Sequence, residues 1–270
     1  MLTQEPLPPL VILLDKPVGP SSFRLVQMVR RILGVKKVGH AGTLDPFASG
    51  LLIICVGRGA TRLVDRLMTG DKKYEATLQL GAATDTHDSQ GKVLTRAPVT
   101  PEHFARLEEV LAPYRGEIWQ SPPAFSAAKH QGKPLYAYAR RGEIIAKPPR
   151  RVLIHELRPL ALDQEQQRLV LRIRCSKGTY IRSLAHDIGR DLGCGAHLVA
   201  LRRLASGSFR VKEALDGAAL CDHELVAAQL AARALDLAAV EARLAQPLAT
   251  SGPPGAGVGD EAGAGDGYRP

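Results

Sequence analysis

An apolar run, LLIICV at residues 51–56, follows directly on the glycine-rich segment KKVGHAGTLDPFASG at residues 36–50. An unbroken apolar run between two glycines is typical of a buried strand, whereas the glycines and the proline before it indicate a loop. Asp45 therefore lies in a loop that leads into the protein core. A purely structural Asp-Pro pair would initiate a turn here, but a chemical role would require the chain to supply an electrostatic partner for the carboxylate.

Further segments in the first third of the chain have clear periodicity. A strand is predicted at residues 10–14, LVILL. Residues 25–33 place apolar side chains at helical spacing and arginines on the other face, and Gly34 ends this helix. Residues 73–80, KYEATLQL, alternate as in a strand with one buried face, so Tyr74 points inward.

Arg182 occupies an unusual position in its predicted helix. The strand RLVLRIRC at residues 168–175 has one largely basic face, and Thr179 caps a helix whose apolar stripe ends at Gly193. Arg182 falls in the first turn, where the helix macrodipole favours anions over cations. A nearby carboxylate or phosphate would explain an arginine at this position.

The rest of the chain mixes helices with strands. Thr100 caps a predicted helix that runs to about Ala112, and residues 197–209 form a strand with a glycine break. Residues 224–244 form one or two helices. This order favours an α+β fold, with strands at both ends of the main body, over a regular βαβ alternation.

We expect a catalytic domain over residues 1–222, with an insertion at 121–152. A helical segment at 223–248 and a disordered Gly/Pro-rich tail at 249–270 follow it. The insertion scatters basic and aromatic residues among prolines, which indicates a segment that grips nucleic acid rather than core. These residues are Lys129, Lys133, Arg140, Arg141, Lys147, Arg150 and Arg151, with Phe125, Tyr136 and Tyr138.

The charge of the chain favours a polyanionic partner. The 36 lysines and arginines outnumber the 27 acidic residues and give a formal net charge of +9. Aromatic residues make up only 4% of the chain, so stacking of successive bases is less suitable than recognition of phosphates and shape. Folded RNA fits this composition better than a single strand, and the alternative is a merely basic soluble protein.

Cysteine usage and hydropathy point to the cytoplasm. The four cysteines are widely separated and form no C-x-x-C pair, which argues against a zinc site and against a disulfide framework. The histidines form no ligand cluster with acidic residues, so no metal site is predicted. Neither a signal peptide nor a membrane span is visible.

Four blocks of the sequence resemble the TruB family of tRNA pseudouridine synthases. These are LLDKPVGPSS, GHAGTLDPFASGLL, KKYEATLQLGAATDTHDSQG and CSKGTYIRSLAHDIG, and the resemblance covers roughly residues 11–209. It implies a mixed, mainly antiparallel central sheet flanked by helices, the fold of the pseudouridine synthase superfamily. It also implies isomerisation of uridine 55 in the T-loop of tRNA by base flipping, without a cofactor.

The resemblance also assigns site residues. It makes Asp45 the catalytic aspartate, Tyr74 an active-site tyrosine and Arg182 the partner of the aspartate. A pocket dry enough to hold a detached uracil would raise the pKa of Asp45, and a guanidinium in contact with it would oppose that shift. The ionised carboxylate could attack the sugar, attack the base or take a sugar proton.

Four further residues match family positions around the substrate. The histidine that matches His40 lies by the space that the flipped base vacates, although His40 could equally be a satisfied loop residue. Tyr180 and Leu201 match positions lining the uracil pocket, and both are also typical core residues. Lys16 could support its loop, touch phosphate or be solvated.

The family pattern leaves two questions open. Members usually carry a small C-terminal RNA-binding domain of the PUA type, and no convincing one follows Phe209. The competing hypothesis is an RNA-binding or RNA-folding module that keeps the scaffold without catalysis, which the intact Asp45, Tyr74 and Arg182 argue against. We expect the partner to be the T-arm of tRNA and the protein to be a monomer.

Overall fold

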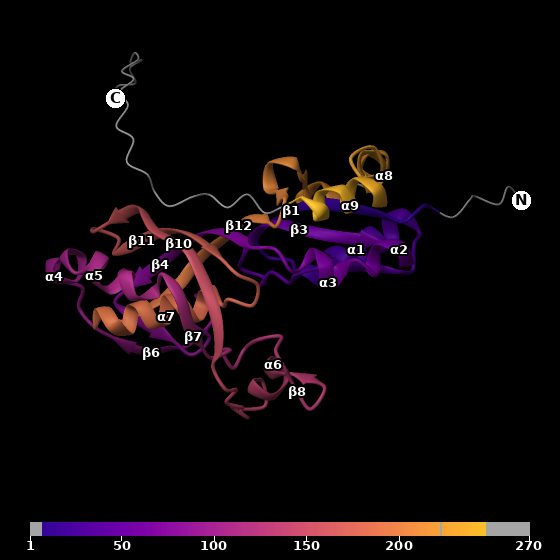
Figure 1. Cartoon of the computed structure of the whole chain (residues 1–270). Coiled ribbons are helices and arrows are strands. Elements are labelled where there is room, and N and C mark those ends of the chain that lie inside the picture. The colour runs from indigo at the N-terminus through magenta and orange to yellow at the C-terminus, as the bar shows by residue number, and fades with distance from the viewer. Residues whose placement is uncertain (1–6, 222, 247–270) are drawn as a thin grey trace, which may run out of the picture.

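The computed structural model describes residues 7–221 and 223–246, and its centre is one large mixed sheet (Figure 1). Its strands run in the order β14 (Leu215–Asp216), β1 (Leu10–Lys16), β3 (Ser49–Val56), β12 (Ala196–Ser206), β4 (Lys72–Leu80), β11 (Arg168–Cys175), β10 (Arg150–Asp163) and β7 (Gly116–Gln120). Outside this path, β2 (Val38–Ala41) pairs with β3, β13 (Phe209–Arg210) with β12 and β15 (Leu235–Asp236) with β1. Most neighbours are antiparallel, which confirms the predicted α+β class with a mainly antiparallel sheet.

The parallel contact between β3 and β12 divides this sheet into two halves. We call β1, β2, β3, β14 and β15 the β3 half, and β4, β7, β10, β11, β12 and β13 the β12 half. Ser49 pairs with Arg202 and Gly50 with Arg203, and we call this contact the seam. Gly50 has φ 101°, and a Cβ there would lie 2.3 Å from the carbonyl oxygen of Arg203. Only glycine fits a backbone approach this close.

The β3 half explains the apolar runs in the sequence, because helices cover both faces of its sheet. Alternate residues of β1 and β3 enter two separate cores. One core contains residues of α1 (Ser22–Leu33) and α8 (His223–Ala232), and the other contains residues of α2 (Gly57–Thr61), α3 (Val64–Leu67) and α9 (Leu237–Ala245). Each aliphatic side chain buried there contributes about 1.5–3 kcal/mol to folding.

The core of the β12 half lies beneath α7 (Ile181–Leu192), which packs on β12 (Figure 1), and it also contains Leu44, Phe47 and Ala48 of the loop between β2 and β3. The predicted apolar stripe of this helix is confirmed, since Ile181, Leu184, Ala185, Ile188 and Leu192 are all buried. Two smaller strands, β5 (Ala82–Thr84) and β6 (Val93–Arg96), form a hairpin, and β5 contacts β12. The turn between them therefore lies close to the start of α7.

Three local predictions were wrong. The loop predicted at residues 36–50 contains β2, because hydrogen bonding to β3 imposes strand geometry on a segment too short to show a period. The helix predicted to run to Ala112 is broken at Arg106 into α4 (Pro101–Ala105) and α5 (Leu107–Leu111), and a 3-10 turn, Ala112–Tyr114, follows. Thr179 is not the N-cap of α7: Tyr180 holds that position, and the Thr179 hydroxyl donates to the Ser176 carbonyl instead.

The segment predicted as an insertion has structure of its own. It contains the hairpin β8 (Lys129–His130) and β9 (Lys133–Pro134), followed by α6 (Leu135–Ala139), while residues 150–152 already belong to β10. The residues predicted as helical near the C-terminus form two helices, α8 and α9. The predicted tail at 249–270 lies outside the described residues. No helix in the described ranges is long and apolar enough to span a membrane.

Candidate active site

The loop that carries Asp45 is anchored on both sides. The Lys16 side chain is fully buried, and its ammonium donates to the carbonyls of Pro46 at 3.2 Å and Ala48 at 2.6 Å. On the other side, the Ser22 hydroxyl bonds both backbone groups of Leu44, at 2.9 and 3.0 Å. The loop between β2 and β3 therefore presents the Asp45 carboxylate from a fixed backbone.

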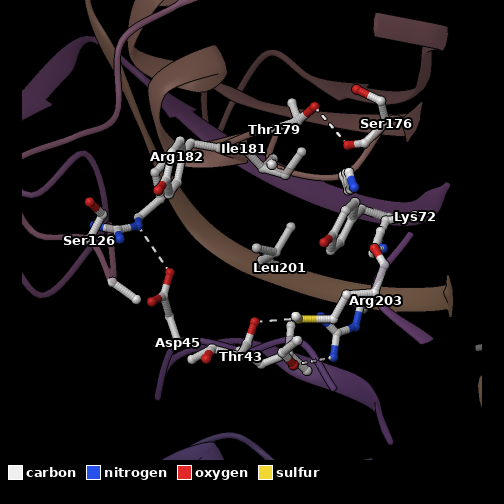
Figure 2. Close-up of a pocket in the computed structure, with 18 of the residues that line it drawn as sticks. Thr43, Asp45, Lys72, Ser126, Ser176, Thr179, Ile181, Arg182, Leu201 and Arg203 are labelled. Carbon is white, nitrogen blue, oxygen red and sulfur yellow. Dashed lines mark hydrogen bonds and ion pairs between the residues drawn. The ribbon is translucent and has the colours of Figure 1, made fainter. Parts of the chain in front are cut away.

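Asp45 pairs with Arg182 across the site (Figure 2). Nε of Arg182 lies 3.0 Å from Oδ2 of Asp45. The arginine side chain is 7% exposed, whereas the aspartate side chain is 38% exposed. A buried cation thus holds a carboxylate that solvent or a substrate can still reach.

The remaining donors of Arg182 are also occupied. Nη1 donates to the carbonyl of Thr86 at 2.9 Å and lies 3.5 Å from Oδ2 of Asp88, and Nη2 donates to the carbonyl of Phe125 at 2.6 Å. The planar guanidinium is therefore fixed between two carboxylates. Acidic partners also account for a cation at the start of α7, where the helix dipole disfavours one.

Burial raises the pKa of the Asp45 carboxyl above its ordinary value. Arg182 opposes this shift, both by its charge and by its hydrogen bond, and Asp88 reinforces it by repulsion. Lys16 adds a smaller contribution in favour of the ionised carboxylate. The charge of Asp45 consequently depends on Arg182.

A cavity of about 560 Å³ opens beside this ion pair. Tyr74, Tyr180 and Leu201 line it together with Asp45 and Arg182, so the structure brings these five predicted residues together. Figure 2 shows Leu201 projecting into the space between Asp45 and the far wall. Burial raises the pKa of the Tyr74 phenol, which keeps this group neutral at physiological pH. The cavity thus combines a carboxyl group paired with a guanidinium and a wall that includes apolar and aromatic side chains.

His40 and Lys16 do not line this cavity. His40 lies on β2, and burial, with a smaller effect of Arg203, lowers its pKa. Lys16 supports the Asp45 loop from beneath, and its complete burial rules out the solvated position. Burial lowers the pKa of Lys16 to about 8, although Asp45 acts in the opposite direction.

Sequence reasoning missed Asp88, the second carboxylate on Arg182. Its side chain is 7% exposed, and its Oδ1 accepts hydrogen bonds from the Thr86 hydroxyl at 2.6 Å and the Gln90 amide at 3.0 Å. The segment TDTHDSQG is polar throughout and looks like an ordinary turn. Only the fold shows that Asp88 points at Arg182.

Sequence reasoning also missed two basic residues of the cavity wall. Arg203 is 2% exposed and donates to the carbonyls of Leu51 at 2.7 Å and Gly42 at 3.0 Å. The two adjacent arginines in HLVALRRL could have indicated this buried residue, because neighbouring residues of a strand face opposite sides. Lys72 is 8% exposed, donates to the carbonyls of Met68 and Gly70, and has a pKa lowered to about 8 by burial.

Tyr180 is fixed by the two ends of the insertion. The side-chain amide of Gln120 accepts from the backbone N–H of Tyr180 at 2.7 Å and donates to its carbonyl at 3.0 Å. The Arg150 guanidinium lies over the Tyr180 ring, 4.8 Å from its centroid. The insertion therefore begins and ends at the cavity.

Two family models match the chain. Residues 30–181 match the model described as TruB family pseudouridylate synthase (N terminal domain), and residues 182–244 match the tRNA pseudouridylate synthase B C-terminal domain. The second match includes most of the helical segment predicted at 223–248. The division of the chain into domains stays a prediction.

Curated relatives match over most of their length. A tRNA pseudouridine synthase B from Desulfotalea psychrophila is 53% identical over 208 residues, which cover 76% of this chain and 85% of the relative. The protein of the same name from Bordetella avium is 50% identical over 210 residues, which cover 76% and 84%.

Two solved structures contain similar chains. A chain in the crystal structure of a Cbf5-Nop10-Gar1 complex is 32% identical with a TM-score of 0.58, and the match covers 77% of this chain and 52% of that chain. A chain in the structure of an H/ACA RNP bound to a substrate RNA containing 2'-deoxyuridine is 30% identical with a TM-score of 0.56, covering 77% and 50%. The present chain spans about half the length of those solved chains.

Proposed function

Because this chain belongs to the TruB family of pseudouridylate synthases, we propose that it isomerises uridine 55 in the T-loop of tRNA to pseudouridine. The observation that carries this proposal is the Asp45–Arg182 pair at the edge of a cavity of about 560 Å³. A base fits such a cavity only when it leaves the stack of the RNA, which costs a few kcal/mol. The target uridine is therefore flipped out of the loop before it reacts.

In the reaction, the bond between N1 of uracil and C1′ of ribose breaks, and a bond between C5 and C1′ forms. C5 releases its hydrogen as a proton, and N1 gains one, so no cofactor is needed. Asp45 acts as the ionised carboxylate, by attack on the sugar, by attack on the base or by removal of a sugar proton. All three routes require Arg182 to hold the charge in place.

The cavity walls hold the detached base while it turns. Tyr74 and Leu201 are 9% and 8% exposed and form a largely apolar surface on which uracil can stack. Tyr180 lines the cavity at the N-terminal end of α7, and the Gln120 side chain holds its backbone by two hydrogen bonds. His40 lies outside this wall, and we assign it to the space that the flipped base leaves in the RNA.

A basic surface supports binding of RNA outside the target loop. It consists of Arg24, Arg30, Arg31, Lys36, Lys37, Arg58 and Arg62, which line two adjacent hollows. Residues 16–44 contain no aspartate or glutamate, so most of this surface arises from a stretch without acidic neighbours. Its charge suits phosphate groups of a folded RNA.

We expect tRNA affinity to depend steeply on salt. If the basic surface and the insertion together contact at least six phosphates, the dissociation constant should rise about 10³-fold between 50 and 200 mM salt. Replacing Arg24 and Arg31 with alanine should reduce the slope of log K against log salt by about 2. Arg66→Ala is the matched control, because Arg66 is already paired with Glu241 at 2.8 Å. A flat salt dependence of the native protein would contradict the RNA assignment.

Release of tritium from tRNA transcripts labelled at uridine C5 tests the proposed function. The native protein should release one equivalent per target uridine, and a transcript with cytidine at the T-loop position should release none. No release from a transcript that the protein still binds would favour a binding module without catalysis. We further assign the protein to the cytoplasm as a monomer that works without cofactor or metal. Sedimentation would check the monomer, and an activity assay in the presence of a chelator would check that no metal is needed.

A further inference from the structure

His87 and His186 form a stacked pair beside Arg182 that the proposed reaction does not use. Their ring centroids lie 4.0 Å apart, and the ring planes are within 7° of parallel. His87 lies in the turn after β5, and His186 lies on α7, one turn after Arg182. Residues four apart share one face of a helix, so His186 and Arg182 face the same turn.

The turn holds this face of α7 at two points. The Thr86 carbonyl and the Asp88 carboxylate both contact the Arg182 guanidinium. The ring of His87, which lies between them in the sequence, stacks on His186. Three consecutive residues thus hold two helix residues, and the stack sets how closely the turn approaches the helix.

The backbone of this turn is tightly constrained. His87 has φ 62°, a conformation that residues other than glycine rarely adopt. A Cβ at Gly91 would lie 2.3 Å from the Thr86 hydroxyl oxygen, so the turn closes against its own far end. The Leu198 amide donates to the His87 carbonyl at 3.0 Å and ties the turn to β12. A strained residue in such a setting persists because its surroundings fix it.

The buried position of His87 favours the neutral form of its ring. Within the described residues, neither Nδ1 has a hydrogen-bond partner, although both atoms are buried. A proton on either would be a buried donor without an acceptor, which is costly. Burial lowers the pKa of His87 to about 4, with further contributions from His186 and Arg182 and opposition from Asp85. The charged groups around the pair are Arg182, Asp187 and Arg190 on α7 and Asp85 and Asp88 in the turn.

We propose that His87 and His186 form a latch that positions Arg182, and that protonation of this latch releases the turn and slows the isomerisation. The proposal rests on the proposed function, because it assigns Arg182 to the support of Asp45 during the reaction. His87 and His186 are positioning residues, since their rings contact each other and do not line the cavity of the site. A second cavity, of about 290 Å³, is lined in part by His186 and reaches the pair from the side of that ring.

The direction of the pH effect follows from the two states of the turn. In an open turn His87 regains an ordinary pKa near 6.5 and takes up a proton below it, whereas the closed turn keeps it neutral to about 4. Closure is therefore fully favourable above pH 6.5 and weakens as the pH falls toward 4. At pH 5 its equilibrium constant should be about thirtyfold lower than at pH 8.

Single-turnover rates of pseudouridine formation between pH 5 and 8.5 test the latch. His87→Asn tolerates the same backbone conformation and removes the ring, and we expect its rate at pH 8 to fall about tenfold with RNA affinity unchanged. His186→Phe keeps an aromatic ring that can stack on His87, and its rate at pH 8 should stay within about twofold of native. Between pH 8 and 5 the native rate should fall at least about threefold further than that of His87→Asn, which has no ring to protonate at this position.

The controls separate the latch from other acid effects. Asp45 gives an acid limb of its own, so the latch is measured as the difference between the native protein and His87→Asn. His103→Gln removes a histidine elsewhere and keeps the capping box of α4, so it should follow the native curve. If His87→Asn follows the native curve, or if it lowers only the melting temperature, the proposal is wrong.

A measurement that does not depend on activity separates the test of the latch from the test of the proposed function. In an NMR titration of the imidazole C2 protons, one signal that is absent from His87→Asn should remain neutral below pH 5. If that signal titrates near pH 6.5, the latch is wrong whatever the activity. A native protein that releases no tritium while its His87 signal stays neutral would contradict the proposed function instead.

Discussion

The Asp45→Asn variant is expected to lose pseudouridine formation by about 10⁴-fold or more while it keeps its affinity for tRNA. Asparagine has nearly the same shape but carries no negative charge, so it cannot attack carbon or accept a proton as the carboxylate does. Three other contacts of Arg182, to Thr86, Asp88 and Phe125, remain in place. Single-turnover tritium release and filter binding would measure the two effects separately.

The stability of this variant is part of the same test. Asp45 is buried enough to raise its pKa, and it is repelled by Asp88, so loss of its charge should leave the free energy of unfolding within about 1 kcal/mol of native. Asp65→Asn, the same substitution on the exposed side of α3, is the matched control and should be fully active. An Asp45→Asn variant that retains a tenth of native activity would exclude this carboxylate from the reaction.

Replacing Arg182 with methionine should abolish activity and also lower the free energy of unfolding by about 3 kcal/mol. The reason is Asp88, whose side chain is 7% exposed and would keep a charge without its cation. The carbonyls of Thr86 and Phe125 would also lose their donor. Urea unfolding followed by circular dichroism would give the free energy, and tritium release the activity.

A second substitution tests where this stability comes from. In the double variant Arg182→Met, Asp88→Asn the uncompensated charge is gone, so at least about 1 kcal/mol should return while activity stays lost. Arg190→Met, on the same helix but 62% exposed and paired only at the surface, should cost less than about 1 kcal/mol. If Arg182→Met is as stable as Arg190→Met, the buried pair has no structural role.

Periodicity predicted the elements that pack by a simple rule. The apolar run at 51–56 and the stripe of α7 follow directly from burial, and both were predicted correctly. The wrong predictions arise from contacts between elements that are distant in the sequence. β2 is a strand because it hydrogen-bonds to β3. The helix breaks at Arg106, and Leu107 after the break packs in the core below α7. Neither cause leaves a local signal in the sequence.

The candidate site was predictable to different degrees for different residues. Asp45 and Arg182 each had a physical oddity in sequence, a charge entering the core and a cation at a helix start, and the fold joins these two in one ion pair. Asp88 had no such signal, because a polar residue in a polar turn is ordinary. Lys16 was ambiguous until its complete burial showed that it serves the loop.

The seam between β3 and β12 has a consequence for how this protein acquires activity. Asp45 lies in the loop between β2 and β3, whereas Tyr74 and Arg182 lie in the β12 half, whose hydrophobic core also contains Leu44 and Phe47 of that loop. Closure of the two pairs at the seam therefore goes together with burial of the loop that carries Asp45. Until that closure, Asp45 has no guanidinium and the cavity has no second wall. Catalysis thus requires the two halves to be docked in register, and any slippage between them would separate Asp45 from Arg182.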